Sequence, residues 1–196
     1  MIALIDYKAG NIASVKKALD ALGAESRITG DPKIVAKAEK IILPGVGHFA
    51  ATETLEKTGL RRAIEDALAS RLPFFGICVG MQWMLESSEE APEVRGLGTL
   101  SCACERFPAN VKSPHVGWNQ IKAVKASRLL KGVGSGAFVY YSHSYRAPVV
   151  EETVAVSDYG GEFSAVVERG DSFGVQFHPE KSGAAGLQIL KNFIEL

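Results

Sequence analysis

The sequence predicts an α/β protein with a mainly parallel central sheet, helices on its faces and an antiparallel portion in its second half. Two observations predict this. In the first half, short apolar runs alternate with segments whose apolar residues recur every three or four positions, as in strands that alternate with helices. From about Thr99 onward, short β-rich runs separated by turn residues replace that alternation. A chain of 196 residues that is 46% hydrophobic is long enough for one core and short for two, so residues 1–196 are expected to form one domain.

The first half is expected to contain four strands and five helical segments. The strands are expected at residues 2–6, 24–28, 40–43 and 73–77. The helical patterns lie at residues 12–22, 32–38, 48–57, 60–70 and from 82 to 86. Asn11 is expected to cap the first helix and Gly23 to close it. Asp31 followed by Pro32 is typical of a helix start.

The second half is expected to contain five short strands and two helices. The β-rich runs are at residues 120–124, 137–142, 153–157, 163–168 and 173–177. A short helix is expected near residues 127–130, and a final helix over residues 186–195, with Leu187, Leu190 and Phe193 on one side. Cys102 and Cys104 are interpreted as strand residues.

Composition excludes several classes of function. The formal net charge is zero, so bulk charge gives no reason to expect nucleic-acid or membrane binding, and no apolar run approaches the roughly 20 residues that a membrane span needs. A disulfide framework is not expected, because the chain has only three cysteines, which is a small and an odd number. Cys102-Ala103-Cys104 has no second pair of ligands, so neither a metal nor a cofactor is expected. The protein is expected to be cytoplasmic.

Cys78 stands between an apolar strand and a helical segment, with Gly76 and Gly80 two residues away on either side. Glycines at these positions are typical of a sharp strand-to-helix turn that presents a reactive side chain at its top. Unpaired N–H groups at the start of a helix stabilise a thiolate, so Cys78 is a candidate nucleophile. The alternative is a buried cysteine that packs as a small hydrophobic residue.

His178 and Glu180 flank Pro179 far downstream. Side chains repeat every two residues in an extended chain, and Pro179 biases His178 toward that conformation. Glu180 can then hold one imidazole nitrogen while the other faces a nucleophile, as a Cys–His pair requires. A histidine before a proline is by itself typical of a loop. Together with the glycine-flanked Cys78, however, it favours a catalytic triad.

A thiolate that attacks an amide carbon generates an oxyanion, which needs N–H donors held in place. The N–H of Val79, directly after the nucleophile, is one candidate donor. Gly45, Val46 and Gly47 are candidates for the second, because the carboxyl ends of parallel strands gather at one edge of a sheet. An ordinary turn is the alternative interpretation of residues 44–47.

Residues 76–82 together with residues 178–180 resemble the motifs of the class I glutamine amidotransferases, whose fold and Cys-His-Glu triad are therefore expected here. Within that family, further segments are similar to the glutaminase subunits of imidazole glycerol phosphate synthases. These segments are residues 6–11, 44–47, 114–119, 141–145 and 174–182.

The resemblance implies a role for each matching residue. Cys78 is the expected nucleophile, His178 the general acid and base, and Glu180 the carboxylate that orients it. Residues 45–47 are expected to rearrange to complete the oxyanion hole. The residues expected to bind L-glutamine are Gln82, Glu90, Ser142, His143 and Ser144. The residues expected at a partner interface are Trp118, Asn119 and Asn11.

The resemblance also implies an activity. The chain is expected to hydrolyse L-glutamine through a cysteinyl thioester and to deliver ammonia to a (β/α)8-barrel cyclase subunit in a heterodimer. That cyclase makes imidazole glycerol phosphate and aminoimidazole carboxamide ribotide in histidine biosynthesis. The alternatives are a glutaminase subunit of another synthase, a catalytically idle regulatory subunit, or a related cysteine hydrolase. In one departure, the family commonly has glycine where this chain has Lys8. Lysine would be strained if that position needs positive φ, so this loop is expected to differ from that of the family.

Overall fold

The computed structural model describes residues 1–196 and has an eight-stranded central sheet in the order β2-β1-β3-β4-β13-β12-β11-β8. The first five strands in that order are parallel, and the other three pair in an antiparallel manner, which confirms the expected fold class. The strands are β1 (Ile2–Ile5), β2 (Ser26–Thr29), β3 (Lys40–Leu43), β4 (Phe74–Ile77), β8 (Lys122–Ala123), β11 (Thr153–Asp158), β12 (Glu162–Arg169) and β13 (Ser172–Val175).

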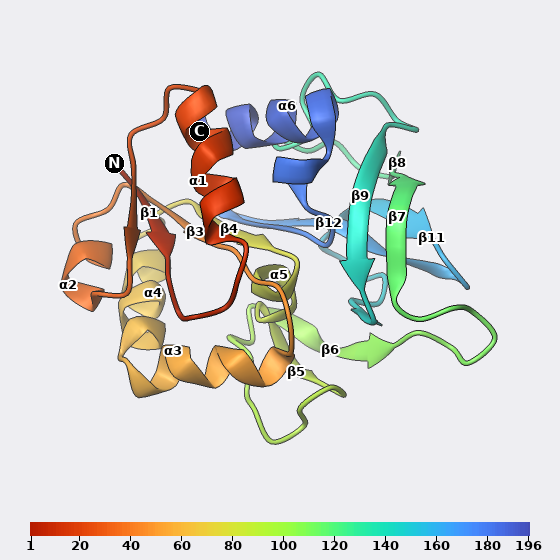
Figure 1. Ribbon diagram of the computed structural model, residues 1–196, viewed down its shortest axis with the longest axis horizontal. Coiled ribbons are helices and arrows are strands. Elements are labelled where there is room, and N and C mark those ends of the chain that lie inside the picture. The colour runs from red at the N-terminus through yellow and green to blue at the C-terminus, as the bar shows by residue number, and fades with distance from the viewer.

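The helices form two groups around this sheet. Helix α1 packs beside α6, whereas α2 and α3 pack with α4 (Figure 1). The helical elements are α1 (Ile12–Ala21), α2 (Pro32–Val35), η1 (Phe49–Thr52), α3 (Glu53–Lys57), α4 (Leu60–Ala69), α5 (Val79–Gln82), η2 (Pro179–Lys181) and α6 (Gly183–Ile194). None of these helices has the length and apolar character that a membrane crossing requires.

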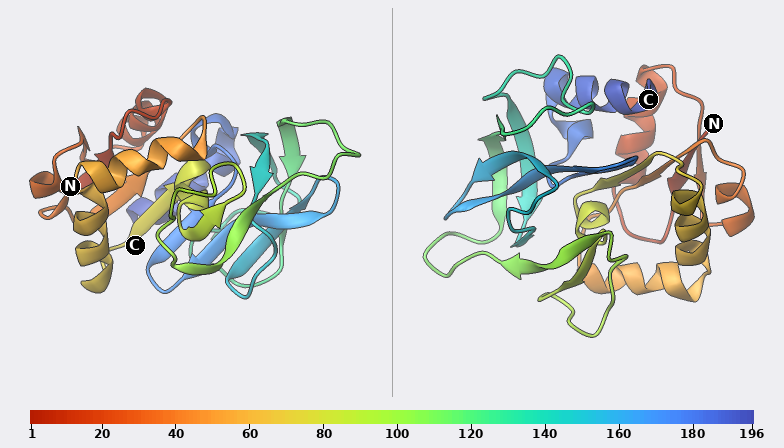
Figure 2. Two further views of the ribbon diagram at one scale, coloured as in Figure 1. Left: turned by 90° about the horizontal axis from the view of Figure 1, so that it is seen from below. Right: turned by 180° about the vertical axis from the view of Figure 1, so that it is seen from behind.

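Two smaller sheets complete the fold. Strands β5 (Leu85–Ser88), β6 (Leu100–Arg106) and β10 (Tyr145–Arg146) form one, with β6 in its middle. Strands β7 (His115–Gln120) and β9 (Phe138–His143) form an antiparallel ribbon. This ribbon stands at the side of the molecule remote from α2 and α4, as Figures 1 and 2 show.

The parallel strands lie at the centre of the hydrophobic core. All four residues of β1, of β4 and of β13 are buried. Strands covered on both faces carry continuous apolar runs rather than alternating ones, and the sequence of β1 and of β4 has this character. Phe75 of β4 and Phe173 of β13 both pack on Phe193 of α6, with ring centroids 5.1 Å and 6.1 Å apart.

The predictions of a helix at residues 82–86 and of another near residues 127–130 are wrong. Helix α5 ends at Gln82, and the chain then enters β5, because the N–H of Leu100 donates to the main-chain oxygen of Met84 at 3.0 Å. Residues 127–130 form no helix, since Arg128 is in a bend and Leu129 and Leu130 are in a turn. There the Ser127 hydroxyl accepts from the N–H of Leu129 at 3.1 Å, and such local side-chain bonds compete with a helix. Helix α2 is also shorter than expected and ends at Val35, although Asp31 caps it as expected.

Candidate active site

Four parallel strands end at the same edge of the sheet and bring the expected reactive residues together. Tyr7 follows β1, Gly45 follows β3, Cys78 follows β4 and His178 follows β13. Strand β13, which was expected in the antiparallel portion, pairs in a parallel manner with β4 and antiparallel with β12. The N–H of Cys78 donates to the main-chain oxygen of Val175 at 2.8 Å. This pairing places two segments that are far apart in sequence beside each other.

Cys78 occupies a strained turn between β4 and α5. Its φ of 53° and ψ of −108° lie where a residue with a Cβ is rarely found. A Cβ on Gly76 would meet the main-chain oxygen of Gly80 at 2.5 Å, and a Cβ on Gly80 would meet the main-chain oxygen of Leu43 at 1.8 Å. The two glycines therefore permit the close approach of β3, β4 and α5 that was expected of this turn. The Cys78 thiol is free and 2% exposed.

His178 and Glu180 are in contact, and Asn11 joins them. Nδ1 of His178 lies 3.0 Å from Oε1 of Glu180. The two residues meet through the 3-10 turn η2 rather than through an extended chain. The Asn11 amide donates to the same carboxylate oxygen and lies 3.5 Å from Nδ1 of His178. Asn11 stands at the N-cap position of α1 with φ of 75° but makes no side-chain cap, so the expected capping role is wrong.

The surroundings of His178 favour its charged form. Burial acts to lower the pKa of the imidazole, but the Cys78 sulfur and the Glu180 carboxylate outweigh it and raise that pKa to about 10. Nε2 of His178 is buried and has no hydrogen-bond partner. Since Glu180 occupies Nδ1, Nε2 is the atom available to exchange a proton with a group held at Cys78.

The expected oxyanion donors do not yet point to a common position. The N–H of Val79 donates to the main-chain oxygen of Gly45 at 3.4 Å, so its only proton is directed at the protein itself. Gly47 has φ of 106° and open space around its Cα. The hydroxyl of Tyr7 is buried without a partner and lies against Gly45, where an added Cβ would meet it at 2.2 Å.

A pocket of about 290 Å³ opens beside Cys78. Its lining includes every residue that was expected to bind glutamine: Gln82, Glu90, Ser142, His143 and Ser144. Glu90 accepts from the N–H of Phe49 at 2.7 Å, which ties it to the segment that follows Gly47. Pockets of amino-acid size with a few convergent polar groups are the usual form of small-molecule sites.

Gln176 is a site residue that the sequence analysis missed. Its amide nitrogen lies 3.7 Å from the Cys78 sulfur, and its side-chain oxygen accepts from Gln82 at 3.1 Å. It is fully buried beyond the end of β13. A polar residue between Val175 and Phe177 in an apolar run was the signal available for it.

Trp118 and Asn119 lie on β7, and Trp118 pairs with Tyr140, whose main-chain oxygen accepts from the N–H of His178 at 2.9 Å. Trp118 is 54% exposed and, with exposed Val116 and Phe138, forms an apolar surface on the β7–β9 ribbon. Asn119 is half-buried, and its amide donates to the main-chain oxygen of Asp158 at 2.9 Å. Asn11, the third residue expected at an interface, directs its amide inward to Glu180.

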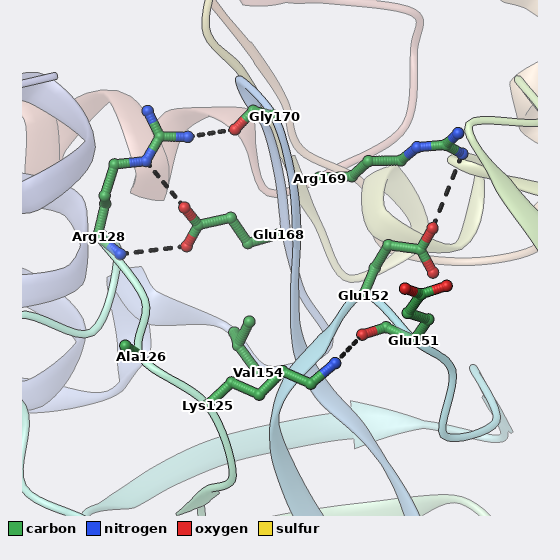
Figure 3. Close-up of a pocket in the computed structure, with 9 residues that line it drawn as sticks. All are labelled: Lys125, Ala126, Arg128, Glu151, Glu152, Val154, Glu168, Arg169 and Gly170. Atoms are coloured by element: carbon green, nitrogen blue, oxygen red, sulfur yellow. Dashed lines mark hydrogen bonds and ion pairs between the residues drawn. The ribbon is translucent and has the colours of Figure 1, made fainter.

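A second hollow, of about 690 Å³, contains none of the expected residues (Figure 3). Its charged groups pair with one another, since Arg128 donates to Glu168 at 2.8 Å and Arg169 lies 3.8 Å from Glu152. Its lining contains no Cys, Ser, Thr or His side chain. Nowhere in residues 1–196 do three or more His, Cys, Asp or Glu side chains gather in a way that could hold a metal ion.

Comparison with known proteins agrees with this geometry. The family model described as glutamine amidotransferase class-I matches residues 3–196. A Moorella thermoacetica protein named imidazole glycerol phosphate synthase subunit HisH is 46% identical over 198 residues, which cover 100% of this chain and 94% of that protein. A Bacillus cereus protein of the same name is 45% identical over 195 residues, covering 98% and 93%.

Solved structures show the same fold at lower sequence identity. A crystal structure of a glutamine amidotransferase matches with a TM-score of 0.79 at 18% identity, covering 100% of this chain and 98% of that one. The structure of PurLQS from Thermotoga maritima matches with a TM-score of 0.78 at 17% identity, covering 99% and 97%. At these identities the likeness concerns the fold alone.

Proposed function

This chain belongs to the class I glutamine amidotransferase family, and from that membership we propose that it is the glutaminase subunit of an imidazole glycerol phosphate synthase. The proposal rests on one observation above all. Cys78, His178 and Glu180 gather at the carboxyl ends of two adjacent parallel strands, beside a pocket of amino-acid size. Full-length identity of 45–46% to two relatives of that name supports the choice of synthase. We take residues 1–196 as one catalytic domain.

The chemistry begins with the Cys78 sulfur. As a thiolate it attacks the side-chain amide carbon of glutamine. A C–S bond forms, the C=O π pair moves to the oxygen, and the carbon becomes tetrahedral and bears an oxyanion. The protonated His178 gives its Nε2 proton to the departing nitrogen, so that ammonia leaves and a thioester remains. The now neutral His178 takes a proton from water, which attacks the thioester and releases glutamate with the thiolate restored. Glu180 holds the imidazole in the orientation that both steps need.

The oxyanion requires a rearrangement of residues 45–47. The N–H of Val79 can stabilise the oxyanion only after the main-chain oxygen of Gly45 has left it. The open space around Gly47 and its positive φ are what a peptide rotation in this segment requires. One oxyanion donor typically contributes about 10²–10³ in rate, so we expect a low basal activity before this segment rearranges.

Glutamate and ammonia are the products of this site, and the sequence contains no phosphate-binding signature for an acceptor substrate. Ammonia released into water is protonated and loses its nucleophilicity. We therefore place a (β/α)8-barrel cyclase on the exposed face of the β7–β9 ribbon, where Val116, Trp118 and Phe138 form an apolar surface. Trp118 and Asn119 are assigned to that interface, together with the β1–α1 segment that carries Asn11. The free cysteines support a reducing compartment, which we take to be the cytoplasm.

A glutaminase assay on the purified chain, alone and with a barrel cyclase loaded with its nucleotide substrate, tests the proposal. We expect low glutamate release alone and an increase of about 10²-fold or more with the loaded cyclase, in line with the gain of one oxyanion donor. Equal rates in the two samples would contradict gating by the partner. Stoichiometric labelling of Cys78 by a glutamine-like electrophile would exclude an idle regulatory subunit, and activation by a different synthase would overturn the choice of partner.

A further inference from the structure

A chain of hydrogen bonds connects β7 to the glutamine pocket through two buried histidines. Nδ1 of His115 lies 3.0 Å from Nε2 of His143. Nε2 of His115 lies 3.4 Å from the amide nitrogen of Asn119, and Nδ1 of His143 lies 2.8 Å from the main-chain oxygen of Tyr145. The triad mechanism uses none of these bonds.

The partners at the two ends fix the direction of every bond in this chain. The oxygen of Tyr145 can only accept, so Nδ1 of His143 carries a proton. Burial, the largest cause, lowers the pKa of His143 to about 3, so the ring is neutral near pH 7 and its Nε2 accepts. His115 must then donate from Nδ1. Its pKa is lowered by burial to about 4, so its Nε2 accepts the remaining N–H of Asn119.

The two rings are held where water cannot replace these partners. His115 and His143 are 5% and 6% exposed. The His115 ring lies between Tyr141 and Tyr159, stacked on both, with centroids 4.8 Å and 4.0 Å away. Phe107 packs edge-on against both histidines. If one of these hydrogen-bond donors were lost, a buried acceptor would be left unsatisfied, and the neighbouring groups would have to shift.

At its other end, this series of hydrogen bonds reaches Gln82. The main-chain oxygen of Tyr145 also accepts from the side-chain nitrogen of Gln82 at 2.9 Å. The second N–H of Gln82 donates to Gln176 at 3.1 Å. Both donors are thus used within the protein, and the side-chain oxygen of Gln82 remains as the atom that can accept from a ligand.

We propose that His115 is a positioning residue for the substrate: acting through His143, it fixes the carbonyl of Tyr145 and thereby holds Gln82 with its oxygen available to the ammonium group of an amino acid. This inference rests on the proposed glutaminase function. His115 does not touch the substrate or the reacting atoms. Its contribution is to binding, and the reactivity of Cys78 does not depend on it.

Three variants separate this role from general packing. His115→Phe keeps a ring between Tyr141 and Tyr159 but removes both polar atoms. His115→Asn places an amide nitrogen near the position of Nδ1 and so restores the donor to His143. Tyr159→Phe is the matched control, because it keeps the stack and loses only the hydroxyl bond to the main-chain oxygen of Lys112.

The measurements are glutamine turnover of each chain with the loaded cyclase, and alkylation of Cys78 by iodoacetamide. We expect His115→Phe to raise KM for glutamine about tenfold while kcat and the alkylation rate stay within twofold. His115→Asn should recover most of the KM, and Tyr159→Phe should match the wild type. An unchanged KM in His115→Phe, or equal losses of kcat, KM and alkylation in both His115 variants, would overturn the proposal.

A measurement on the unmodified chain keeps the inference testable if a variant fails to fold. Two-bond 1H–15N correlation spectra at pH 7 should show His115 and His143 both protonated at Nδ1. Protonation of His143 at Nε2 would overturn the inference. If the wild-type chain released no glutamate with any cyclase, the proposed function would fail, and the tautomer result would still stand by itself.

Discussion

The main-chain N–H of Val79 donates to the main-chain oxygen of Gly45 at 3.4 Å. Alkylation of Cys78 by iodoacetamide needs no oxyanion donor, whereas glutamine hydrolysis does. We expect the loaded cyclase to raise glutamate release by about 10²-fold or more, in line with the gain of one donor, and to change the alkylation rate by less than threefold. Both rates are measured on the same sample. A parallel increase of the two would locate the activation at the thiolate instead.

The turn around Cys78 should tolerate no side chain at Gly80. A Cβ there would meet the main-chain oxygen of Leu43 at 1.8 Å, and backbone atoms cannot give way as a side chain does. We expect Gly80→Ala to lower the free energy of unfolding by about 3 kcal/mol or more, which is roughly 6–12 °C in Tm for a chain of this size. Gly134→Ala is the control, because nothing lies within 4 Å of its Cβ. Similar Tm values for the two variants would contradict the close approach.

The ring of His178 should stay protonated well above the pH at which a histidine ordinarily loses its charge. The sulfur and Glu180 raise the pKa of His178 to about 10 against the effect of burial, so the ring stays protonated throughout pH 6–9. We expect two-bond 1H–15N correlation spectra to show both nitrogens of this ring protonated over that range, whereas an ordinary histidine loses its charge near pH 6.5.

Glu180→Gln is the matched control for that titration. The amide keeps the size of the side chain and removes the negative charge, so the His178 ring should lose its proton at a lower pH than in the wild type. We also expect glutamine turnover to fall about 10²-fold or more. A wild-type ring that loses its charge near pH 6.5 would show that the sulfur and Glu180 do not act on it.

The buried histidine pair should make the protein sensitive to acid. Burial lowers the pKa of His115 to about 4. Burial first, and then the charges of His115, His178 and Arg146, lower that of His143 to about 3 against the bond to Tyr145. Between these values and about 6.5 the unfolded chain binds protons that the folded chain does not. The contribution of the two neutral rings to the free energy of unfolding is therefore complete above pH 6.5. It is lost as the pH falls toward 4, by up to about 1.4 kcal/mol per pH unit for each ring.

Urea unfolding at pH 7.5 and pH 5.0 measures this loss. We expect a smaller loss in His115→Phe than in the wild type, because one of the two titrating rings is gone. Comparing the two proteins cancels the contributions of the carboxylates, which they share. An equal loss in both would mean that His115 titrates normally in the folded state.

Local patterns were sufficient to predict the Cys78 turn, since Gly76 and Gly80 mark it by their spacing, and the contact between His178 and Glu180, since only Pro179 separates them. The loop at Lys8 was expected to differ from that of the family, because lysine replaces a glycine there. Lys8 nevertheless has φ of 69°, the conformation that glycine favours. The β5 strand could not be predicted, because Leu85 leaves the helical pattern to pair with Leu100, which lies further along the chain.

Interactions between distant segments account for the rest of what was missed. Asn11 has the residue type and the position of a helix cap, yet its amide bonds to Glu180, which only the parallel pairing of β13 with β4 brings near. The bond between His115 and His143 likewise exists because β7 pairs with β9 in a register that places these two residues opposite each other. No periodicity in the sequence specifies that register.

The hydroxyl of Tyr7 lies buried against Gly45 without a hydrogen-bond partner. Burial, and then the charge of Cys78, hold its pKa well above the usual range, so it stays neutral. An unsatisfied buried hydroxyl costs stability, and Tyr7→Phe removes it while keeping the ring in the core. We expect this variant to be more stable by about 1 kcal/mol in urea unfolding. Leu4→Ala, in the β1 strand that leads into Tyr7, should lose about 2–5 kcal/mol of stability, as a large-to-small change in the core does. A loss of stability in Tyr7→Phe would show that the hydroxyl has a bound partner, and the space beside Gly45 would then be occupied rather than free for the rotation of the oxyanion segment.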